Sequence, residues 1–286
     1  MGTPLKSTTK VLRFILAIPL LVSYPLIAAE LPDNLPGPKK PTPLDQFILA
    51  GMKEAKVPGL AALTIKEGKI FWAGYYGWAN IEDKQPVTKD TLFQLASISK
   101  TVTACMIMQQ VEQGNLKLDA DINTLLPFKV RNPKHADKPI TLRQLLTHTS
   151  GIRDNWSVLE DTWVKNGDFP KSLGKSLLAY LREDGEFFSA KKSFYSWAPG
   201  TKNQYSNVGF ALAAYVAEAQ LKASFEALCE KGIFKPLGID GATFRLAAAN
   251  LKQVAMPYAY RKKMGGFKAL GHHGYLDYPA GTLRTT

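Results

Sequence analysis

The hydrophobic and polar positions along the chain predict strands first and a long run of helices after them. Apolar residues recur at helical spacing over 44–52. Two short apolar runs follow, at 60–65 and 70–76, and the polar link between them contains Gly68, which is typical of a β-hairpin. A further short strand is expected at 92–95.

From position 97 onward the pattern becomes helical. Thr141 followed by Gln144 predicts a capping box at the start of one of these helices. Residues 258–286 are strand-like again, so the order of elements predicts an α/β (α+β) fold, a sheet flanked by helices with a helical lobe beside it. The expected helices span about 97–113, 141–147, 172–182, 208–221 and 224–232.

The beginning of the chain differs from the rest. Three cations precede an apolar run over 14–29, which is the layout of a cleaved secretory signal. The alternative is a retained membrane anchor, but the run is short for a span and contains two prolines. Residues 30–43 are proline-rich and predict an extended linker. We therefore expect a signal peptide (1–29), a linker and one folded domain (44–286), in a periplasmic or secreted protein with no stable membrane insertion after cleavage.

Composition and charge narrow the classes of partner. The chain is 45% apolar, which supports a large core and argues against disorder. Its formal net charge is +12, but the cations are scattered and form no basic stripe with aromatic residues, so we expect no nucleic-acid partner. The two cysteines, Cys105 and Cys229, each lie in an apolar helical pattern, which favours buried free thiols over a disulfide.

Several common catalytic motifs are absent from the sequence. There is no Gly-x-Ser-x-Gly, no His-Glu-x-x-His, no phosphate loop and no dinucleotide fingerprint. The four histidines have no accompanying carboxylates in a pattern typical of metal ligands. The expectation is therefore that the protein uses neither a metal nor a cofactor.

Ser97 and Lys100 are the strongest candidates for a catalytic pair. Ser-x-x-Lys occurs four times, but only Ser97 opens a helix with a strongly apolar continuation, which predicts a helix buried on all sides. The positive end of a helix favours negative charge on Ser97 and on a substrate oxyanion. That field and burial are expected to lower the pKa of Lys100, so that it can accept the Ser97 proton. The alternative is an ordinary helix start, with Ser97 as a cap and Lys100 in solvent.

Tyr205 and Asn207 form a second candidate group. They are the only Tyr-x-Asn in the chain, and on an extended loop both side chains project to the same side. Tyr205 is suited to passing a proton to a leaving group, and Asn207 to holding a substrate amide. The alternative is a buried tyrosine beside a turn asparagine.

Together these and other segments resemble the serine β-lactamase-related family, nearest the class C β-lactamases, DD-peptidases and family esterases. The resemblance runs from about Leu44 to the end of the chain. It implies a β-lactamase/DD-peptidase-like fold. Five segments carry it, in order Phe93-Gln94-Leu95-Ala96-Ser97-Ile98-Ser99-Lys100-Thr101, Leu145-Leu146-Thr147-His148-Thr149-Ser150-Gly151-Ile152, Pro199-Gly200 through Tyr205-Ser206-Asn207, Ile233-Phe234-Lys235-Pro236-Leu237-Gly238 and Tyr278-Pro279-Ala280-Gly281.

The resemblance also implies roles for the candidate residues. Ser97 is then the acylated nucleophile, and its backbone N–H is one oxyanion donor. Lys100 and Tyr205 share the base and acid work, and Asn207 binds the carbonyl side of the substrate. The implied protein is a serine hydrolase acting through an acyl-enzyme on a β-lactam, a D-alanyl peptide or an ester, so its partner is a small-molecule or peptidoglycan-type substrate. The alternative is a non-catalytic or vestigial penicillin-binding-like periplasmic protein.

One motif of the family has no counterpart in the sequence. The Lys/His-Thr/Ser-Gly strand of the family lies downstream of Tyr-Pro-Ala-Gly, whereas His272-His273-Gly274 lies upstream of it and has a histidine in place of the hydroxyl residue. We therefore expect a C-terminally incomplete domain that lacks the last strands and the second oxyanion donor and whose sheet has an unpaired edge. The segment from Trp156 to Trp197 holds aromatic residues that are expected to lie in the core of the lobe, with a lining of the cleft as the alternative. They are Trp163, Phe187, Phe188, Phe194 and Tyr195.

Overall fold

The computed structural model describes residues 35–286. The predicted signal peptide and the first part of the predicted linker, 30–34, lie outside the described residues. Helix α1 (Pro43–Ala55) begins where the linker was expected to end. Thr42 and Asp45 form a reciprocal capping box at its start, and the proline at the first helical position suits the fixed backbone of the first turn.

The predicted hairpin is present as β1 (Gly59–Lys66) and β2 (Lys69–Asn80), which pair antiparallel. Glu67 and Gly68 both have positive φ, the conformation that a two-residue hairpin turn requires. Strand β3 (Gln85–Pro86) pairs with the other edge of β2. Within residues 35–286, β1 has no neighbour but β2, so its outer edge is unpaired there, as expected.

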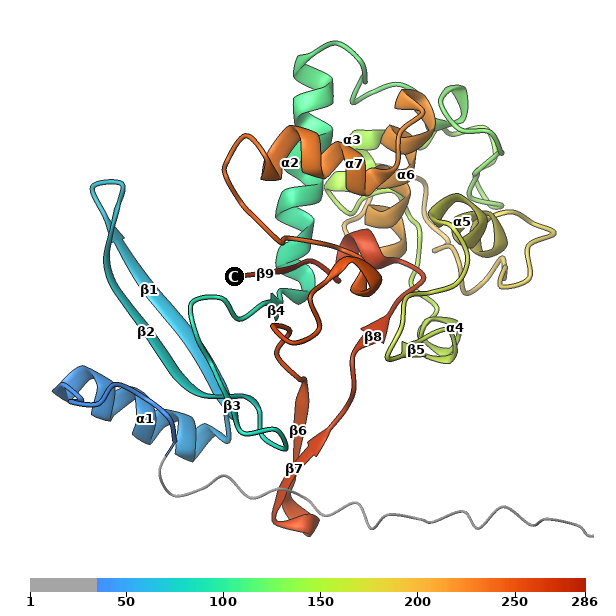
Figure 1. The fold of residues 1–286 in the computed structure, drawn as a ribbon. Helices are drawn as coiled ribbons and strands as arrows, with labels where there is room; N and C mark the ends of the chain where they lie inside the picture. Colours follow the sequence, from blue (N-terminus) through green and yellow to red (C-terminus); the bar gives the residue numbers. More distant parts are fainter. Residues whose placement is uncertain (1–34) are drawn as a thin grey trace, which may run out of the picture.

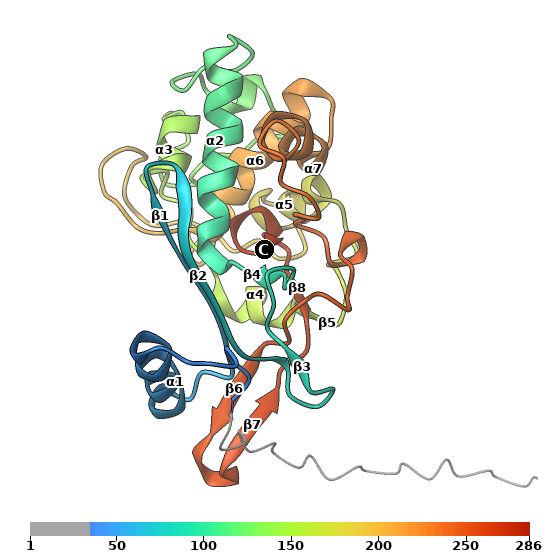
Figure 2. The ribbon, with the colours of Figure 1, turned by 60° about the vertical axis from the view of Figure 1, so that its left-hand side comes forward.

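The other strands lie in two-stranded antiparallel ladders. The ladders β4–β9 and β5–β8 join segments that are far apart in the sequence, whereas β6–β7 is a local hairpin that points away from the helices between residues 99 and 229 (Figures 1 and 2). The strands are β4 (Phe93–Gln94), β5 (Val164–Lys165), β6 (Tyr258–Arg261), β7 (Gly266–Ala269), β8 (His273–Gly274) and β9 (Arg284–Thr285).

All five helices expected from position 97 onward are present within a few residues of their predicted ends, and the short helix over 156–161 was not predicted. Thr141 and Gln144 form the predicted capping box of α3. The α-helices are α2 (Ser99–Glu112), α3 (Leu142–Leu146), α4 (Trp156–Asp161), α5 (Leu173–Leu181), α6 (Asn207–Leu221) and α7 (Phe225–Cys229), the last continued by the π-turn η3 (Glu230–Phe234). Short 3-10 turns are η1 (Ala96–Ile98), η2 (Ile122–Thr124), η4 (Leu246–Ala248), η5 (Lys262–Met264) and η6 (Tyr278–Ala280).

Helix α6 is the centre of the hydrophobic core. Nine residues between Val208 and Ala217 are buried, and they lie on all sides of the helix. Helix α6 packs against α2, α3, α5 and α7 (Figure 1). A helix that is apolar around its whole circumference must bury all of its faces. The same reasoning predicted that α2 is buried on all sides, and that prediction is wrong.

Helix α2 is buried on one side only. Ser99, Thr103, Met106 and similar positions face the core, while Cys105 and Met108 on the other side are exposed. The apolar composition of α2 did not reveal that neighbouring elements cover only one of its faces. Both cysteines are free thiols, as expected, but only Cys229 is buried.

No helix in the described part of the chain combines the length and apolar content needed to cross a bilayer.

Candidate active site

Ser97 lies in the 3-10 turn η1, directly before α2, and not in the α-helix that the pattern predicted. The residue before it, Ala96, has φ 47°, in the left-handed region that costs an L-residue free energy. A bond from Leu95 N–H to Leu283 O (2.8 Å) and the β4–β9 pairing fasten the chain on the N-terminal side of the turn. The C-terminal segment thus holds a strained turn that presents Ser97 to solvent.

Lys100 is buried in the first turn of α2, with 7% of its surface exposed, so the alternative of a solvated lysine is wrong. Its Nζ lies 2.7 Å from Asn207 Oδ1, 2.7 Å from Ala280 O and 3.2 Å from Ser97 Oγ. An ammonium group has three donors, whereas a neutral amine has two donors and one lone pair. Both forms fit this site. The ammonium group donates to all three oxygens, and the neutral amine donates to two of them and accepts a hydrogen bond from the Ser97 hydroxyl.

Tyr205 stands on the open side of Ser97. Its hydroxyl lies 2.7 Å from Ser97 Oγ, and its ring centroid lies 4.8 Å from Lys100 Nζ, within the range of a cation–π contact. The residue is 45% exposed, so the alternative of a buried tyrosine is also wrong. The structure therefore brings Ser97, Lys100, Tyr205 and Asn207 together around one hydroxyl group.

His148 supports the loop that carries Tyr205. The two rings are in contact, with centroids 4.5 Å apart, and His148 Nδ1 accepts a hydrogen bond from Ser206 N–H at 3.2 Å. Nδ1 can accept only when it carries no proton. Burial, and secondly the positive charge of Lys100, lower the pKa of His148, whereas Asp154 opposes the shift. The imidazole is thus held neutral near pH 7.

Asp154 is a site residue that the sequence reasoning missed. Its carboxylate accepts four hydrogen bonds, from Ser206 Oγ, Asn207 N–H, Asn207 Nδ2 and Val208 N–H, at 2.9 to 3.1 Å. Three of these donors belong to the first residues of α6, where backbone amides have no acceptor within the helix. The bond to Nδ2 turns the Asn207 amide so that Oδ1 faces Lys100.

Little in the sequence could have identified Asp154. An acidic residue beside a helix N-terminus is a common signal, but Asp154 lies about 50 positions before the helix that it caps. It follows Ile152, the end of one of the matched segments, and that proximity is the only hint.

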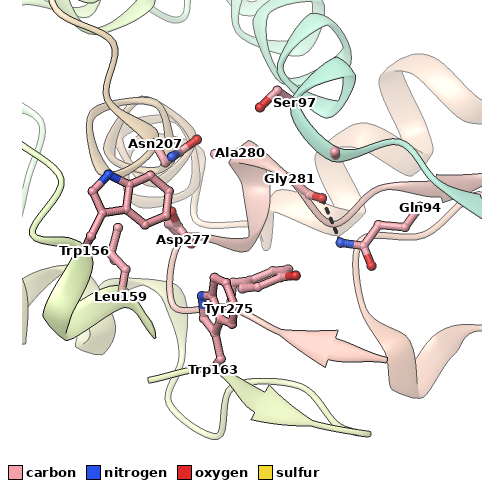
Figure 3. A pocket seen from close by; sticks show the side chains of 11 residues that line it. Gln94, Ser97, Trp156, Leu159, Trp163, Asn207, Tyr275, Asp277, Ala280 and Gly281 are labelled. Carbon is pink, nitrogen blue, oxygen red and sulfur yellow. Dashed lines mark hydrogen bonds between the residues drawn. The ribbon is translucent and has the colours of Figure 1, made fainter. Parts of the chain in front are cut away.

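A pocket of about 220 Å³ opens beside Ser97 and Asn207 (Figure 3). Trp156 and Trp163 line it and are 54% and 43% exposed, so the expectation of a core position is wrong for Trp163, which lines the cleft instead. Phe194, from the same stretch, is buried as expected. The remaining lining residues are Gln94, Ala96, Leu159, Tyr275, Asp277, Ala280 and Gly281.

The histidines at 272 and 273 lie outside this pocket lining. His273 pairs with Lys165 in the β5–β8 ladder, and its ring contacts Trp163 at a centroid distance of 5.8 Å. Burial lowers the pKa of both His272 and His273. In the described residues, no group of three or more His, Cys, Asp or Glu side chains is arranged to hold a metal ion.

Comparison with known proteins gives consistent matches over most of the chain. The family model described as Beta-lactamase matches residues 44–286. Esterase EstB of Burkholderia gladioli is 32% identical over 222 residues, which are 75% of this chain and 54% of EstB. The chain spans about half the length of the curated relatives it matches.

Solved structures show the same fold. A class C beta lactamase aligns with a TM-score of 0.63 and 28% identity, covering 85% of this chain and 60% of that one. The D-alanine carboxypeptidase AmpC from Burkholderia cenocepacia aligns with a TM-score of 0.60 and 27% identity, covering 84% and 59%.

Proposed function

The chain belongs to the beta-lactamase family, and on this basis we propose that it is a serine hydrolase that forms an acyl-enzyme on Ser97. One observation carries the proposal. Ser97 Oγ lines a pocket and lies 2.7 Å from the Tyr205 hydroxyl and 3.2 Å from Lys100 Nζ. A nucleophile within hydrogen-bonding reach of a proton acceptor, which is itself held by further groups, is the arrangement that acyl transfer requires.

In the proposed acylation step, Ser97 Oγ attacks the substrate carbonyl carbon and loses its proton to the Tyr205 oxygen, while Tyr205 passes its own proton to the leaving group. Tyr205 has this role because it is the nearer of the two candidates and Lys100 Nζ is held by two other acceptors. Lys100 then stabilises negative charge that develops on Ser97 and Tyr205. Water attacks the acyl-enzyme in the second step and releases the acid.

The Ser97 N–H is the proposed oxyanion donor on this chain. It belongs to the first turn before α2, where amides have no acceptor within the helix. The positive end of α2 adds to its effect on a developing oxyanion. Asn207, fixed by Asp154 on one side and Lys100 on the other, is placed to contact the substrate beside the carbonyl.

Among β-lactams, D-alanyl peptides and esters, we place esters first. The pocket beside Ser97 is lined mostly by apolar and aromatic groups, which suits the acyl chain of an ester. The 32% identity to a protein named as an esterase supports the same choice.

Labelling tests the proposal directly. The chain is treated with a fluorophosphonate and with a fluorescent penicillin, and the adduct is mapped by mass spectrometry. We expect the fluorophosphonate adduct on Ser97 and its loss in Ser97→Ala. Ser172→Ala is the matched control, because Ser172 is an exposed residue directly before α5 that opens another Ser-x-x-Lys segment, and its loss should not affect labelling.

Turnover of nitrophenyl butyrate then tests the substrate class. Tyr205→Phe should slow acylation by about 100- to 10,000-fold, the usual contribution of a positioned acid–base group. An adduct on Ser172 or Ser189 would refute the assignment. A chain that folds but takes up neither reagent would instead support the non-catalytic, penicillin-binding-like alternative.

A further inference from the structure

Asp277 is a carboxylate without a cationic partner in the wall of the pocket. It lies directly before η6 and, in Figure 3, between Trp156 and Tyr275. Within residues 35–286, only the backbone N–H of Asp277 itself donates a hydrogen bond to its carboxylate, and no cation lies within ion-pair distance. Burial, and secondly the negative charge of Asp154, raise its pKa to about 6, whereas its own backbone N–H and the positive charge of Lys100 oppose the shift. Asp277 is half-buried, and a carboxylate in such a wall without a counter-charge in contact is stabilised by a bound cation.

The charged groups nearby do not supply a counter-charge in contact with Asp277. Lys100 Nζ already contacts Ser97, Asn207 and Ala280. Asp154 carries the same charge as Asp277, and its oxygens are taken up by donors at the start of α6. The pocket therefore contains one negative charge that no group of the described chain neutralises by direct contact.

Three aromatic rings line the same pocket. Trp163 and Tyr275 meet edge to face, with centroids 5.4 Å apart, and Trp156 lies across the pocket from them in Figure 3. Both tryptophans are about half exposed. Aromatic faces attract cations, and tryptophan does so most strongly. A carboxylate beside several aromatic rings is the combination that recognises an ammonium group.

The position of Tyr205 indicates which part of the substrate enters the pocket. Tyr205 passes a proton to the leaving group in the proposed reaction, and it is not among the residues that line the pocket. Ser97 and Asn207 do line the pocket. The pocket therefore extends from the attacked carbonyl carbon toward the acyl part of the substrate.

We propose that this pocket is an acyl subsite for a cationic group, and that the preferred substrates carry an ammonium group, primary or quaternary, on their acyl part. The inference rests on the proposed function, because it requires acyl transfer to Ser97. Asp277 supplies the counter-charge, and Trp156, Trp163 and Tyr275 supply the aromatic surface.

A pair of isosteric esters tests the subsite. One is the nitrophenyl ester of γ-trimethylammoniobutyrate, and the other has carbon in place of the charged nitrogen. Each kcat/KM is divided by the rate of spontaneous hydrolysis of the same ester. We expect the cationic ester to be preferred by about 10-fold or more, a ratio that corresponds to roughly 1.4 kcal/mol. In Asp277→Asn the ratio should fall to within about twofold of one. Asp161→Asn, an exposed carboxylate at the end of α4, should leave it unchanged.

The outcomes separate the subsite from the proposed function. A ratio near one in a chain whose Ser97 is acylated would overturn the subsite and leave the serine hydrolase intact. If neither ester acylates Ser97, the proposed function fails. The subsite is then tested by binding alone, because tetramethylammonium should quench tryptophan fluorescence saturably, and less so in Asp277→Asn. Absence of saturable quenching in the unaltered chain would overturn the subsite as well.

Discussion

Individual residues at this site act mainly by fixing the direction of a neighbour. Asp154 touches neither Ser97 nor the pocket, yet its bond to Asn207 Nδ2 determines that Oδ1 faces Lys100. Lys100 also contacts Ser97, so the orientation of the Asn207 amide bears on a group beside the proposed nucleophile. Asp154 is therefore a positioning residue.

Asp154→Ala should reduce both stability and acylation. The substitution leaves four donors without their acceptor, and hydrogen bonds to charged groups contribute about 1.5–3 kcal/mol each when a partner is removed. We expect the free energy of unfolding in urea to fall by about 2–4 kcal/mol, because water replaces part of the loss. Acylation of the folded fraction should slow by at least about tenfold, since Asn207 is free to turn.

The measurement is the acylation rate divided by the amount of Ser97 that a fluorophosphonate finally labels. This quantity does not change when part of the sample is unfolded. Asp161→Ala is the control. If the normalised rate in Asp154→Ala equals that of the unaltered chain, Asp154 serves only the stability of α6.

His148 makes a testable contribution to the pH dependence of stability. Its pKa is lowered in the folded chain, whereas the unfolded chain has a histidine pKa near 6.5. As the pH falls below about 6.5, the unfolded state binds the proton first, so stability is complete above that pH and is lost below it. The loss is at most about 1.4 kcal/mol per pH unit.

His148→Asn removes this titration. Asparagine tolerates the left-handed backbone at this position, where φ is 56°, and offers an oxygen to the Ser206 N–H. Urea unfolding at several pH values between about 5 and 7.5 should show a smaller loss of stability toward acid in the variant than in the unaltered chain. Identical slopes would mean that His148 does not contribute.

At the scale of elements, the candidate active site depends on the first turns of two helices. The start of α2 is a strained 3-10 turn, and the start of α6 is capped by Ser206 Oγ, which bonds to Gly209 N–H, and by the distant Asp154. The two helix starts face each other through Lys100 and Asn207. At the start of α6, Ser206 and Asp154 accept the backbone N–H groups, whereas the positive end of α2 faces the site at Ser97.

Two substitutions of Ala96, the strained residue in the turn before α2, should change the free energy of unfolding in opposite directions. Ala96→Gly should raise the free energy of unfolding by up to about 1 kcal/mol, because a glycine has no Cβ to oppose the positive φ, although it adds entropy to the unfolded chain. Ala96→Val should lower it by about 1–3 kcal/mol, since a β-branched side chain is least compatible with this backbone. Thermal denaturation measures both, and destabilisation by Ala96→Gly would show that the turn is not strained.

At the scale of the whole molecule, the site is assembled from segments that lie far apart in the chain. The last described residues supply Ala280 O to Lys100 and Leu283 O to the nucleophile turn, and Arg284 is fully buried beside them. The hairpin β1–β2 contributes none of these contacts, and large apolar side chains on it are exposed, including Leu63, Ile70 and Phe71. The site therefore depends on the helical part and on the segment that returns to it at the end.

Export is a prediction for the whole protein that rests on the sequence of its first residues. Three cations followed by an apolar run lead us to propose cleavage near Ala28 or Ala29. Intact-mass analysis of the protein produced by a secreting host should then give a chain that begins at Ala29 or Glu30. A mass that retains Met1 to Ala28 would contradict the proposal.

The sequence by itself determined the features that depend on near neighbours. The hairpin turn at Gly68, the capping box of Thr141 and Gln144, and the five helices follow from periodicity and local hydrogen bonding. The proximity of Ser97 to Lys100 follows in the same way, because three positions in a helical turn bring two side chains to one face.

Only the tertiary structure decided which distant residues meet. Asp154 caps a helix about 50 positions away, Ala280 accepts a bond from Lys100 across 180 positions, and Trp156 and Asp277 share a pocket. Spacing along the chain does not encode such contacts, because they arise when apolar faces pack together and bring their polar edges with them. For the same reason, the apolar pattern of α2 did not show that one of its faces is exposed.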